Sequence, residues 1–527
     1  MLTDEAPGRS QRSSASRLRS LRIGIAVLLA PIALGGCSGS DARPRTGDPL
    51  TDIRNPDLKV AERIEASQLA WADVRAGVSN REETRKAVKD IAWPSNQTPA
   101  DLRLAVIRQL LDDSEGEADS RNFVRLMLPY ERKFPIVEYL SAEAARRGWE
   151  EVTPSLVRSY ARPSPDIPDA DRPERKALEA LHPGKTAAEV AFEVFLNLPV
   201  EDGPYAADDR RVLREDAWDL LNRLDSNGSI RASLLAAAAE PSARYREQEP
   251  IEVSLAACVS DLRLLPKTGR ELSWLQRLRE AHRLDRSKTP WWTQAAQAMT
   301  KAKDEDVPHL RMRHVEPIRW ASIHQPAWLE ASRATLLAEL DSRLQGRPFN
   351  RRARAREGDP LRYERLSEWE PVLSRVDLIA ILVIDTTLQD EAIIREMFRQ
   401  ADLDHDDKTT EYGGILDQLS YEDQNHFAYR ALLYPPRPMS RVGDRKFIAS
   451  RDMIEQSDRS LAHYHFHVQS WNSGAFTGPS PEDLLYATNH ARQCLVLTAV
   501  GRGELAVDYY QPGGIVIDLG EIPRPTP

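Results

Sequence analysis

Three histidines at two-residue spacing are the residues of this chain best suited to metal chemistry. They are His463, His465 and His467, in the run 461–468. Side chains two residues apart on a β-strand point to the same face, so any adjacent pair could bind one metal ion. Histidine nitrogen suits zinc, and a catalytic zinc takes three protein ligands and leaves one position for water. The run therefore predicts a zinc site on a strand.

Acidic residues on either side of the histidines can complete such a site. Ser480 and Asp483 open a predicted helix that begins thirteen residues after His467, and Asp483 is a candidate third ligand. Hydrolysis also needs an acid–base group for the water, and Glu411, at the start of a strand-like run, is a candidate for that role.

The ordered set resembles the JAMM (MPN-plus) zinc metallopeptidases. That family carries a glutamate in E-x-x-G-[LIV]-[LM], then H-x-H, then S-x-x-D. The matching residues here are Glu411 with Gly414-Ile415-Leu416, His465 with His467, and Ser480 with Asp483. The resemblance covers roughly residues 375–520.

The resemblance implies a role for each matched residue. His465, His467 and Asp483 would bind Zn²⁺, and Glu411 would accept a proton from the zinc-bound water and pass it to the leaving amine. Ser480 would hydrogen-bond the oxyanion, where charge develops in the transition state. The implied activity is hydrolysis of a peptide or isopeptide bond, with a peptide or protein as substrate.

Two departures from the family pattern affect the region after the second histidine. Val468 stands where the family usually has proline, and the twelve residues 468–479 exceed the family gap. We expect a longer active-site loop that preserves the ligands and alters substrate access.

Each piece of the motif also has a purely structural interpretation. Histidines on a strand can be stacked or hydrogen-bonded to each other. Ser480 is a good helix N-cap, followed by a proline at the first helical position. Glu411 could simply begin a strand, and His463 could be only a neighbour of the site.

An α+β pattern over residues 372–527 would position these groups. We expect a helix over Thr387–Gln400, a second helix over Pro481–Arg492 and several short β-rich runs. The predicted strands are Phe427–Tyr434, Leu461–Val468, Cys494–Val500, Leu505–Tyr510 and Ile515–Leu519. The acidic residues Asp402, Asp404 and Asp406 resemble a calcium loop, but Asp407 replaces its required glycine, so we expect an ordinary acidic loop.

Residues 57–366 show helical periodicity. Apolar stripes such as Leu213, Ala217 and Leu221 predict amphipathic helices in an irregular, possibly HEAT-like array, although no repeat period is evident. Three motifs in this region could suggest a binding function, but a structural role explains each one better. Gly184-Lys185-Thr186 is best explained as a helix cap, and Trp291-Trp292 as buried aromatic residues. The arginine cluster is best explained as a solvated linker; it consists of Arg347, Arg351, Arg352, Arg354 and Arg356.

The N-terminus has the pattern of a bacterial lipoprotein signal. An arginine- and serine-rich start precedes the apolar run Ile23–Leu34. This run has twelve residues, whereas a helix that spans a bilayer needs about 20 residues. Gly35 and Gly36 then precede Cys37. We expect a signal peptide over residues 1–36, lipidation of Cys37 and a tether over 37–56, which together place the protein at the cell envelope, with the outer membrane weakly favoured.

Composition is consistent with a multidomain globular protein of 527 residues. The net charge of −9 argues against general nucleic-acid binding, and only Cys258 and Cys494 follow Cys37, too few for a disulfide framework. The sequence therefore predicts a lipid-anchored protein with an all-α region and a zinc hydrolase domain. The alternative is a non-catalytic envelope scaffold that binds a protein partner through its helices.

Overall fold

The computed structural model describes residues 45–94, 97–199, 206–225, 228–238, 249–287, 290–348, 364–418 and 429–526. The chain divides into two compact units, residues 1–87 and 88–527. Cys37 and the rest of the predicted signal peptide lie outside the described residues. Among the helices that are described, none has both the length and the apolar character required to cross a membrane.

The described part of the first unit is helical. It contains α1 (Pro49–Arg54), α2 (Val60–Arg75) and the first residues of α3 (Arg81–Ala92). Asp48 caps α1 by accepting the backbone N–H groups of Leu50 and Thr51. The buried Arg63 of α2 donates to the carbonyl oxygen of Ile53 at 2.7 Å and so joins the two helices.

The second unit begins with a succession of helices, as the periodicity predicted. Its helices up to residue 344 are α4 (Ala100–Asp112), α5 (Glu117–Met127), α6 (Phe134–Arg147), α7 (Thr153–Ala161), α8 (Pro173–Leu181), α9 (Ala187–Leu196), α10 (Ala206–Leu224), α11 (Ser229–Ala238), α12 (Ile251–Leu262), α13 (Gly269–Leu284), α14 (Trp291–Met299), α15 (Val315–His324), α16 (Pro326–Glu330) and α17 (Arg333–Leu344). Leu213, Ala217 and Leu221 are all buried along α10. A HEAT-like repeat stays a prediction.

The structural interpretations of the helical features agree with the contacts of their described residues. Thr186 is the N-cap of α9 and forms a capping box with Glu189. Trp291 and Trp292 are both buried. Arg347 pairs with Asp385 at 2.6 Å, while Arg351, Arg352, Arg354 and Arg356 lie outside the described residues.

Three helices lead from this region into the sheet: α18 (Leu366–Trp369), α19 (Arg375–Thr387) and α20 (Glu391–Asp406). The predicted helix Thr387–Gln400 is wrong in its start and its end. Asp390 caps α20 by accepting the N–H of Ala392, so that helix begins after Thr387 has already ended α19. Asp402, Asp404 and Asp406 belong to the last turns of α20 and form no acidic loop.

The C-terminal part contains a mixed six-stranded sheet in the order β2-β1-β3-β4-β5-β6. Its strands are β1 (Gly413–Gln418), β2 (Tyr429–Leu433), β3 (His463–His467), β4 (Cys494–Gly501), β5 (Glu504–Gln511) and β6 (Ile515–Pro523). All neighbouring pairs are antiparallel except β3 and β4. The parallel pair is joined by a crossover through α22 (Pro481–His490), while the short α21 (Arg451–Gln456) precedes β3. The predicted strands and the helix after Ser480 are thus present.

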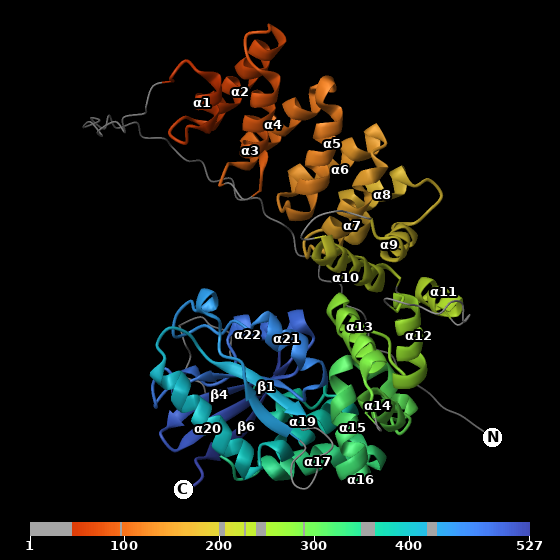
Figure 1. The fold of residues 1–527 in the computed structure, drawn as a ribbon, viewed down its shortest axis with the longest axis vertical. Helices are drawn as coiled ribbons and strands as arrows, with labels where there is room; N and C mark the ends of the chain where they lie inside the picture. Colours follow the sequence, from red (N-terminus) through yellow and green to blue (C-terminus); the bar gives the residue numbers. More distant parts are fainter. Residues whose placement is uncertain are drawn as a thin grey trace, which may run out of the picture. The chain divides into compact units, whose positions relative to one another are not determined.

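The two faces of β3 have different partners. The Tyr464 hydroxyl donates to Gln400 of α20 at 2.6 Å, whereas His463 contacts the Tyr486 hydroxyl of α22 at 2.7 Å. Even-numbered residues of β3 therefore face α20 and odd-numbered residues face α22, as the alternation of a strand requires. Figure 1 shows α20 and α22 on different sides of the sheet.

A buried ionic cluster joins α13 to the sheet-bearing part beside α22. Both oxygens of Asp458 accept from Arg277 of α13 at 2.7 Å, and Arg492 donates to the same carboxylate at 3.0 Å. The Arg492 guanidinium lies 3.3 Å from the ring centroid of Trp274, whose indole N–H donates to the Asp458 carbonyl. These contacts make α13 and the strand-bearing region parts of one packed structure.

Candidate metal centre

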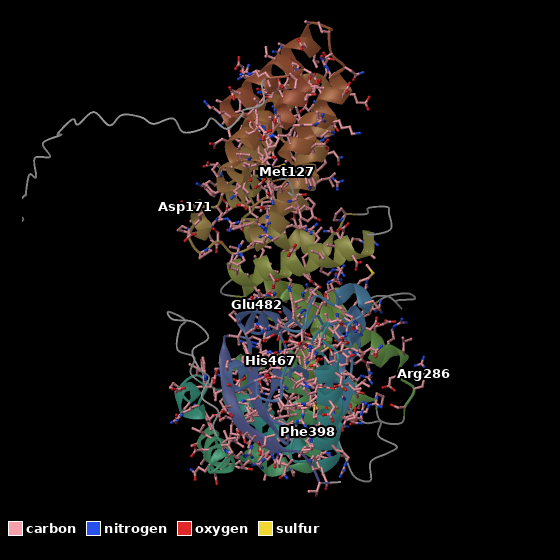
Figure 2. The ribbon with its side chains drawn as sticks, turned by 90° about the vertical axis from the view of Figure 1, so that its left-hand side faces the viewer. Met127, Asp171, Arg286, Phe398, His467 and Glu482 are labelled. Carbon is pink, nitrogen blue, oxygen red and sulfur yellow. The ribbon has the colours of Figure 1, made fainter. Side chains whose placement is uncertain are left out.

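The predicted ligands converge on the α22 face of β3. His465 and His467 point to this face because they are two residues apart, and both are buried. Asp483 reaches them from the first turn of α22, which follows Ser480 as N-cap. In Figure 2, His467 lies between Glu482 of α22 and Phe398 of α20. The crossover helix therefore delivers the carboxylate to the histidines.

The two histidine nitrogens and the Asp483 carboxylate lie close enough together to share a single metal ion. The Nε2 atoms of His465 and His467 are 3.3 Å apart, and Asp483 oxygens lie 3.4 Å and 3.9 Å from them. Two ligands at about 2.05 Å from a tetrahedral zinc are about 3.3 Å apart. The separation of the two histidine nitrogens matches that of tetrahedral ligands, and a carboxylate oxygen of Asp483 lies close to each nitrogen, so this donor set could hold a metal ion.

Glu411 completes the buried cluster. One carboxylate oxygen of Glu411 and the nitrogens of His465 and His467 all lie within 4.8 Å of one another, so these three residues could also hold a metal ion. Among the residues that the structure describes, this is the one such group of three or more His, Cys, Asp and Glu side chains. Glu411 lies just before β1, where its backbone N–H meets the carbonyl of Lys446.

Gln469 holds Glu411 in place, and the family motif did not predict this contact. Its side-chain amide donates to Glu411 Oε1 at 2.6 Å. Gln469 belongs to the longer segment after His467, so that insertion supplies a partner for the acid–base candidate. The only sign of this contact in the sequence was the extra length of the segment 468–479.

The remaining ring nitrogens of the two ligand histidines have their own partners. His467 Nδ1 lies 3.0 Å from the carbonyl oxygen of Phe476, and His465 Nδ1 lies 3.4 Å from the Tyr510 hydroxyl. The Phe447 ring stacks on His465 with a centroid separation of 5.7 Å. Such contacts fix the ring orientation, which leaves Nε2 of both histidines directed at the metal position.

Ser480 has the capping role that its sequence position predicted. Its hydroxyl oxygen accepts the N–H of Asp483 at 3.2 Å, and its own N–H donates to Asp483 Oδ2 at 2.7 Å. The capping box holds the Asp483 carboxylate in place. With its oxygen used as an acceptor, the Ser480 hydroxyl keeps its proton for donation into the cavity that it lines.

Burial and neighbouring charges shift the acid–base properties of the centre. Burial raises the pKa of Glu411 to about 7, against the opposing effect of His465. Burial also raises the pKa of Asp404 to about 8, and the charge of Glu411 acts in the same direction. Although burial alone would raise it, the pKa of Asp483 is lowered because His465 and His467 lie close to it. A carboxyl with a pKa near 7 can both accept and release a proton at neutral pH.

Two adjoining cavities open onto the centre, and Glu411, His467 and Ser480 line both. One, of about 510 Å³, extends past His463 along α22. The other, of about 400 Å³, extends along the segment after β3 to Phe476. An extended chain could therefore occupy both sides of the metal position.

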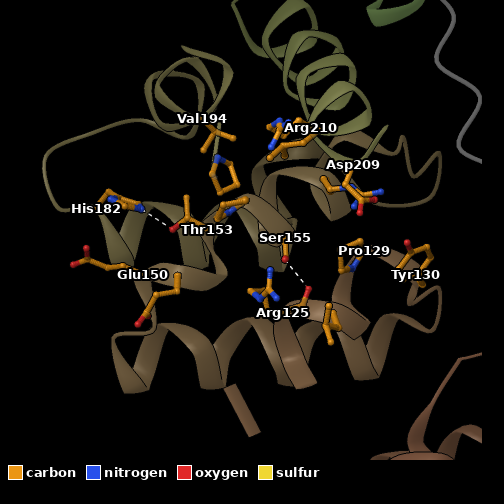
Figure 3. Close-up of a pocket in the computed structure, with 16 residues that line it drawn as sticks. Arg125, Pro129, Tyr130, Glu150, Thr153, Ser155, His182, Val194, Asp209 and Arg210 are labelled. Carbon is orange, nitrogen blue, oxygen red and sulfur yellow. Dashed lines mark hydrogen bonds between the residues drawn. The ribbon is translucent and has the colours of Figure 1, made fainter. Parts of the chain in front are cut away.

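A separate cavity of about 690 Å³ lies among α5, α7, α9 and α10. Figure 3 shows Arg125, Tyr130, Thr153 and His182 around it. Thr153 pairs with His182 at 2.9 Å, and Tyr130 is 53% exposed. The metal-holding cluster found among the described residues lies elsewhere, and none of its members lines this cavity.

Comparisons of the chain with known protein families, curated proteins and solved structures find no match.

Proposed function

We propose that this protein is a zinc-dependent hydrolase of peptide or isopeptide bonds with a JAMM-like centre. The observation that carries the proposal is the convergence of His465, His467 and Asp483 within 4 Å of one another, with Glu411 beside the two histidines. These are the residues that match the family motif, in the same order. When bound, zinc supplies Lewis acidity that polarises a carbonyl and lowers the pKa of water to about 7.

Glu411 is suited to act as the general base and then the general acid. Its carboxylate takes a proton from the attacking water while the water oxygen bonds to the scissile carbonyl carbon. The carbon–nitrogen bond then breaks, and the same proton goes to the leaving nitrogen. Gln469 holds one oxygen of Glu411, which leaves the other for the proton.

Ser480 is suited to stabilise the tetrahedral intermediate. Its hydroxyl proton can donate to the oxyanion as negative charge develops there. The hydroxyl is fixed at the start of α22 by the N–H of Asp483, so little reorganisation is needed during the reaction. The two cavities beside the centre suit a polypeptide that continues on both sides of the cleaved bond.

Metal analysis of the purified protein tests the centre. We expect one zinc per chain, lost after His465→Ala with His467→Ala and retained after His309→Ala, an exposed histidine elsewhere. Glu411→Gln should retain zinc and abolish cleavage of peptide, isopeptide and cell-wall peptide libraries. Absence of stoichiometric zinc, or full activity of the Glu411→Gln protein, would refute the proposal.

We also propose that Cys37 carries a lipid that tethers the protein at a bacterial envelope. The support is the arrangement of the apolar run 23–34 and the two glycines before Cys37. Incorporation of labelled palmitate into the wild-type protein, but not into Cys37→Ser, is the expected result. Equal labelling of both proteins would refute lipidation at this residue. The tether directs the substrate choice towards envelope or extracellular polypeptides.

The second candidate function is a non-catalytic envelope protein that binds a partner through its helices. The groove of about 690 Å³ in the helical region, with Leu126 and Tyr130 exposed at it, favours this candidate. A fully zinc-loaded protein that cleaves none of the three libraries would support it over the hydrolase.

A further inference from the structure

The cavity beside the metal position ends in a group of hydrogen-bonding aromatic side chains. His463, Tyr486 and His490 line this end, on the same face as the ligand histidines. The Tyr486 and His490 rings lie 4.4 Å apart between centroids. None of these three residues belongs to the metal-holding cluster. Their polar atoms are therefore not needed as metal ligands.

His463 carries an unsatisfied hydrogen-bonding atom at this position. Its Nδ1 lies 2.7 Å from the Tyr486 hydroxyl, while its Nε2 is buried and has no hydrogen-bond partner among the residues that the structure describes. When the hydroxyl donates to Nδ1, the ring carries its own proton on Nε2. A buried donor without an acceptor is costly, so native sites of this kind usually receive an acceptor from a ligand or water.

The charge around this end of the cavity favours a negatively charged acceptor. Arg277 and Arg492 share the single carboxylate of Asp458, so that trio has a net positive charge. Elsewhere along the same cavity, the positive charges of Arg445 and Lys446 are offset by Glu411, Glu482 and Asp483. Burial lowers the pKa of His490 to about 4, and the charges of Arg270, Arg492 and Arg277 lower it in the same direction. An anionic group is thus favoured over a cationic one.

The distance from the metal position limits which anionic group can reach His463. Residues two apart on a strand are separated by about 6.6 Å, so His463 lies that far along the strand from His465. A carboxylate three or four bonds from the scissile carbonyl carbon spans a comparable distance. Aspartate and glutamate side chains on the acyl side of the cleaved bond have these lengths.

We propose that the end of the cavity at His463 is a subsite for the side-chain carboxylate of an acidic residue on the acyl side of the scissile bond. His463 Nε2 donates to the carboxylate, and Tyr486 fixes the ring. The inference rests on the proposed function, because the metal places the scissile carbonyl. The protein would then cleave after aspartate or glutamate in preference to other residues.

Binding of small hydroxamates to the zinc-loaded protein, measured by calorimetry, tests the subsite without turnover. The hydroxamate anchors each probe on the metal. Succinic and glutaric monohydroxamates present the carboxylate at the aspartate and glutamate distances, and butyryl hydroxamate has no carboxylate. We expect one of the acidic probes to bind about tenfold more tightly than the butyryl probe, as a charge-assisted hydrogen bond predicts.

Variants of the subsite should remove this preference and leave the anchor intact. His463→Phe should bind all three probes with similar affinity, and Thr488→Ala, on an exposed position of α22, should keep the tenfold preference. Tyr486→Phe removes only the hydroxyl and should also reduce the preference for the acidic probes. It replaces His463→Phe in this test if that variant does not fold.

Several results would overturn the subsite. Equal binding of the acidic and butyryl probes to the wild-type zinc protein would do so while leaving the metal centre in place. Equal binding of succinic monohydroxamate and its carboxamide analogue would refute recognition of charge. A protein that holds no zinc, or fails to bind even the butyryl probe, would overturn the proposed function and the subsite together.

Discussion

Removal of the Tyr464 hydroxyl should destabilise the protein without disturbing the metal centre. Tyr464 is 1% exposed and its hydroxyl donates to Gln400 Oε1 at 2.6 Å. The amide of Gln400 is itself buried and donates to the carbonyl of Ala431 at 3.1 Å, so it cannot turn away to find another partner. Tyr464→Phe therefore leaves a buried carbonyl oxygen without a donor.

The cost of this change follows from the burial of Gln400. A lost hydrogen bond that leaves a buried partner unsatisfied costs about 1–3 kcal/mol, and we expect Tyr464→Phe to lower the free energy of unfolding by about 2 kcal/mol. Tyr412→Phe is the matched control, because its hydroxyl bonds to Asp407 in a half-buried setting. Its cost should stay below about 1 kcal/mol.

Urea denaturation and zinc content together test the reasoning. The midpoint for Tyr464→Phe should fall with no change in the slope of free energy against urea, and the zinc content should equal that of the wild type. The second result follows because Tyr464 faces α20 while His465 and His467 face α22. Loss of zinc with unchanged stability would show that the two faces of β3 have been assigned wrongly.

Three further changes have definite expected outcomes. A Cβ at Gly414 would lie 2.1 Å from a backbone oxygen of β2, so Gly414→Ala should lower the free energy of unfolding by about 3 kcal/mol. If thermal denaturation showed that this variant is as stable as the wild type, the register of β1 and β2 would be contradicted. Burial raises the pKa of Asp219 to about 6, so this carboxylate destabilises the fold above that pH and the penalty disappears as pH falls towards 4. Asp219→Asn keeps an acceptor for the Gly269 N–H. It should stabilise the protein by about 2 kcal/mol more at pH 7.5 than at pH 4.5, measured by urea denaturation; equal effects at both pH values would argue against the raised pKa of Asp219. Asp458→Asn leaves the buried Arg492 and the half-buried Arg277 without their shared carboxylate and should cost about 3 kcal/mol by the same method. A loss under about 1 kcal/mol would mean that the cluster is solvated.

Much of the candidate centre could be predicted because its residues are local or ordered along the chain. The two-residue spacing of His465 and His467 defines a shared face in any strand. Ser480 and Asp483 define a helix start, and the structure contains that helix as the crossover between β3 and β4. Asp483 meets the histidines because the crossover helix begins beside β3. The order of the motif residues in the family was enough to predict this meeting from the sequence.

Other features depend on contacts between distant segments and gave no local signal. Helix α19 is buried on every side, and its apolar run Leu378–Ile384 lacks the periodicity by which a helix is recognised. Its capping box between Ser374 and Asp377 was the available clue to its start. Gln469 could not be assigned to Glu411, because 58 residues separate them and the loop that joins them has no regular pattern.

The cluster around Asp458 bears on how this centre could be moved between proteins. Arg277 and Trp274 come from α13, which ends about 130 residues before the first strand, yet they neutralise and cover a carboxylate next to the helix that carries Asp483. A gene segment that starts near residue 372 would encode every candidate ligand but would omit these partners. The contacts of Asp458 with Arg277 and Trp274 therefore require that the centre and the preceding helices be transferred together. A chimera that transplants the centre must include α13.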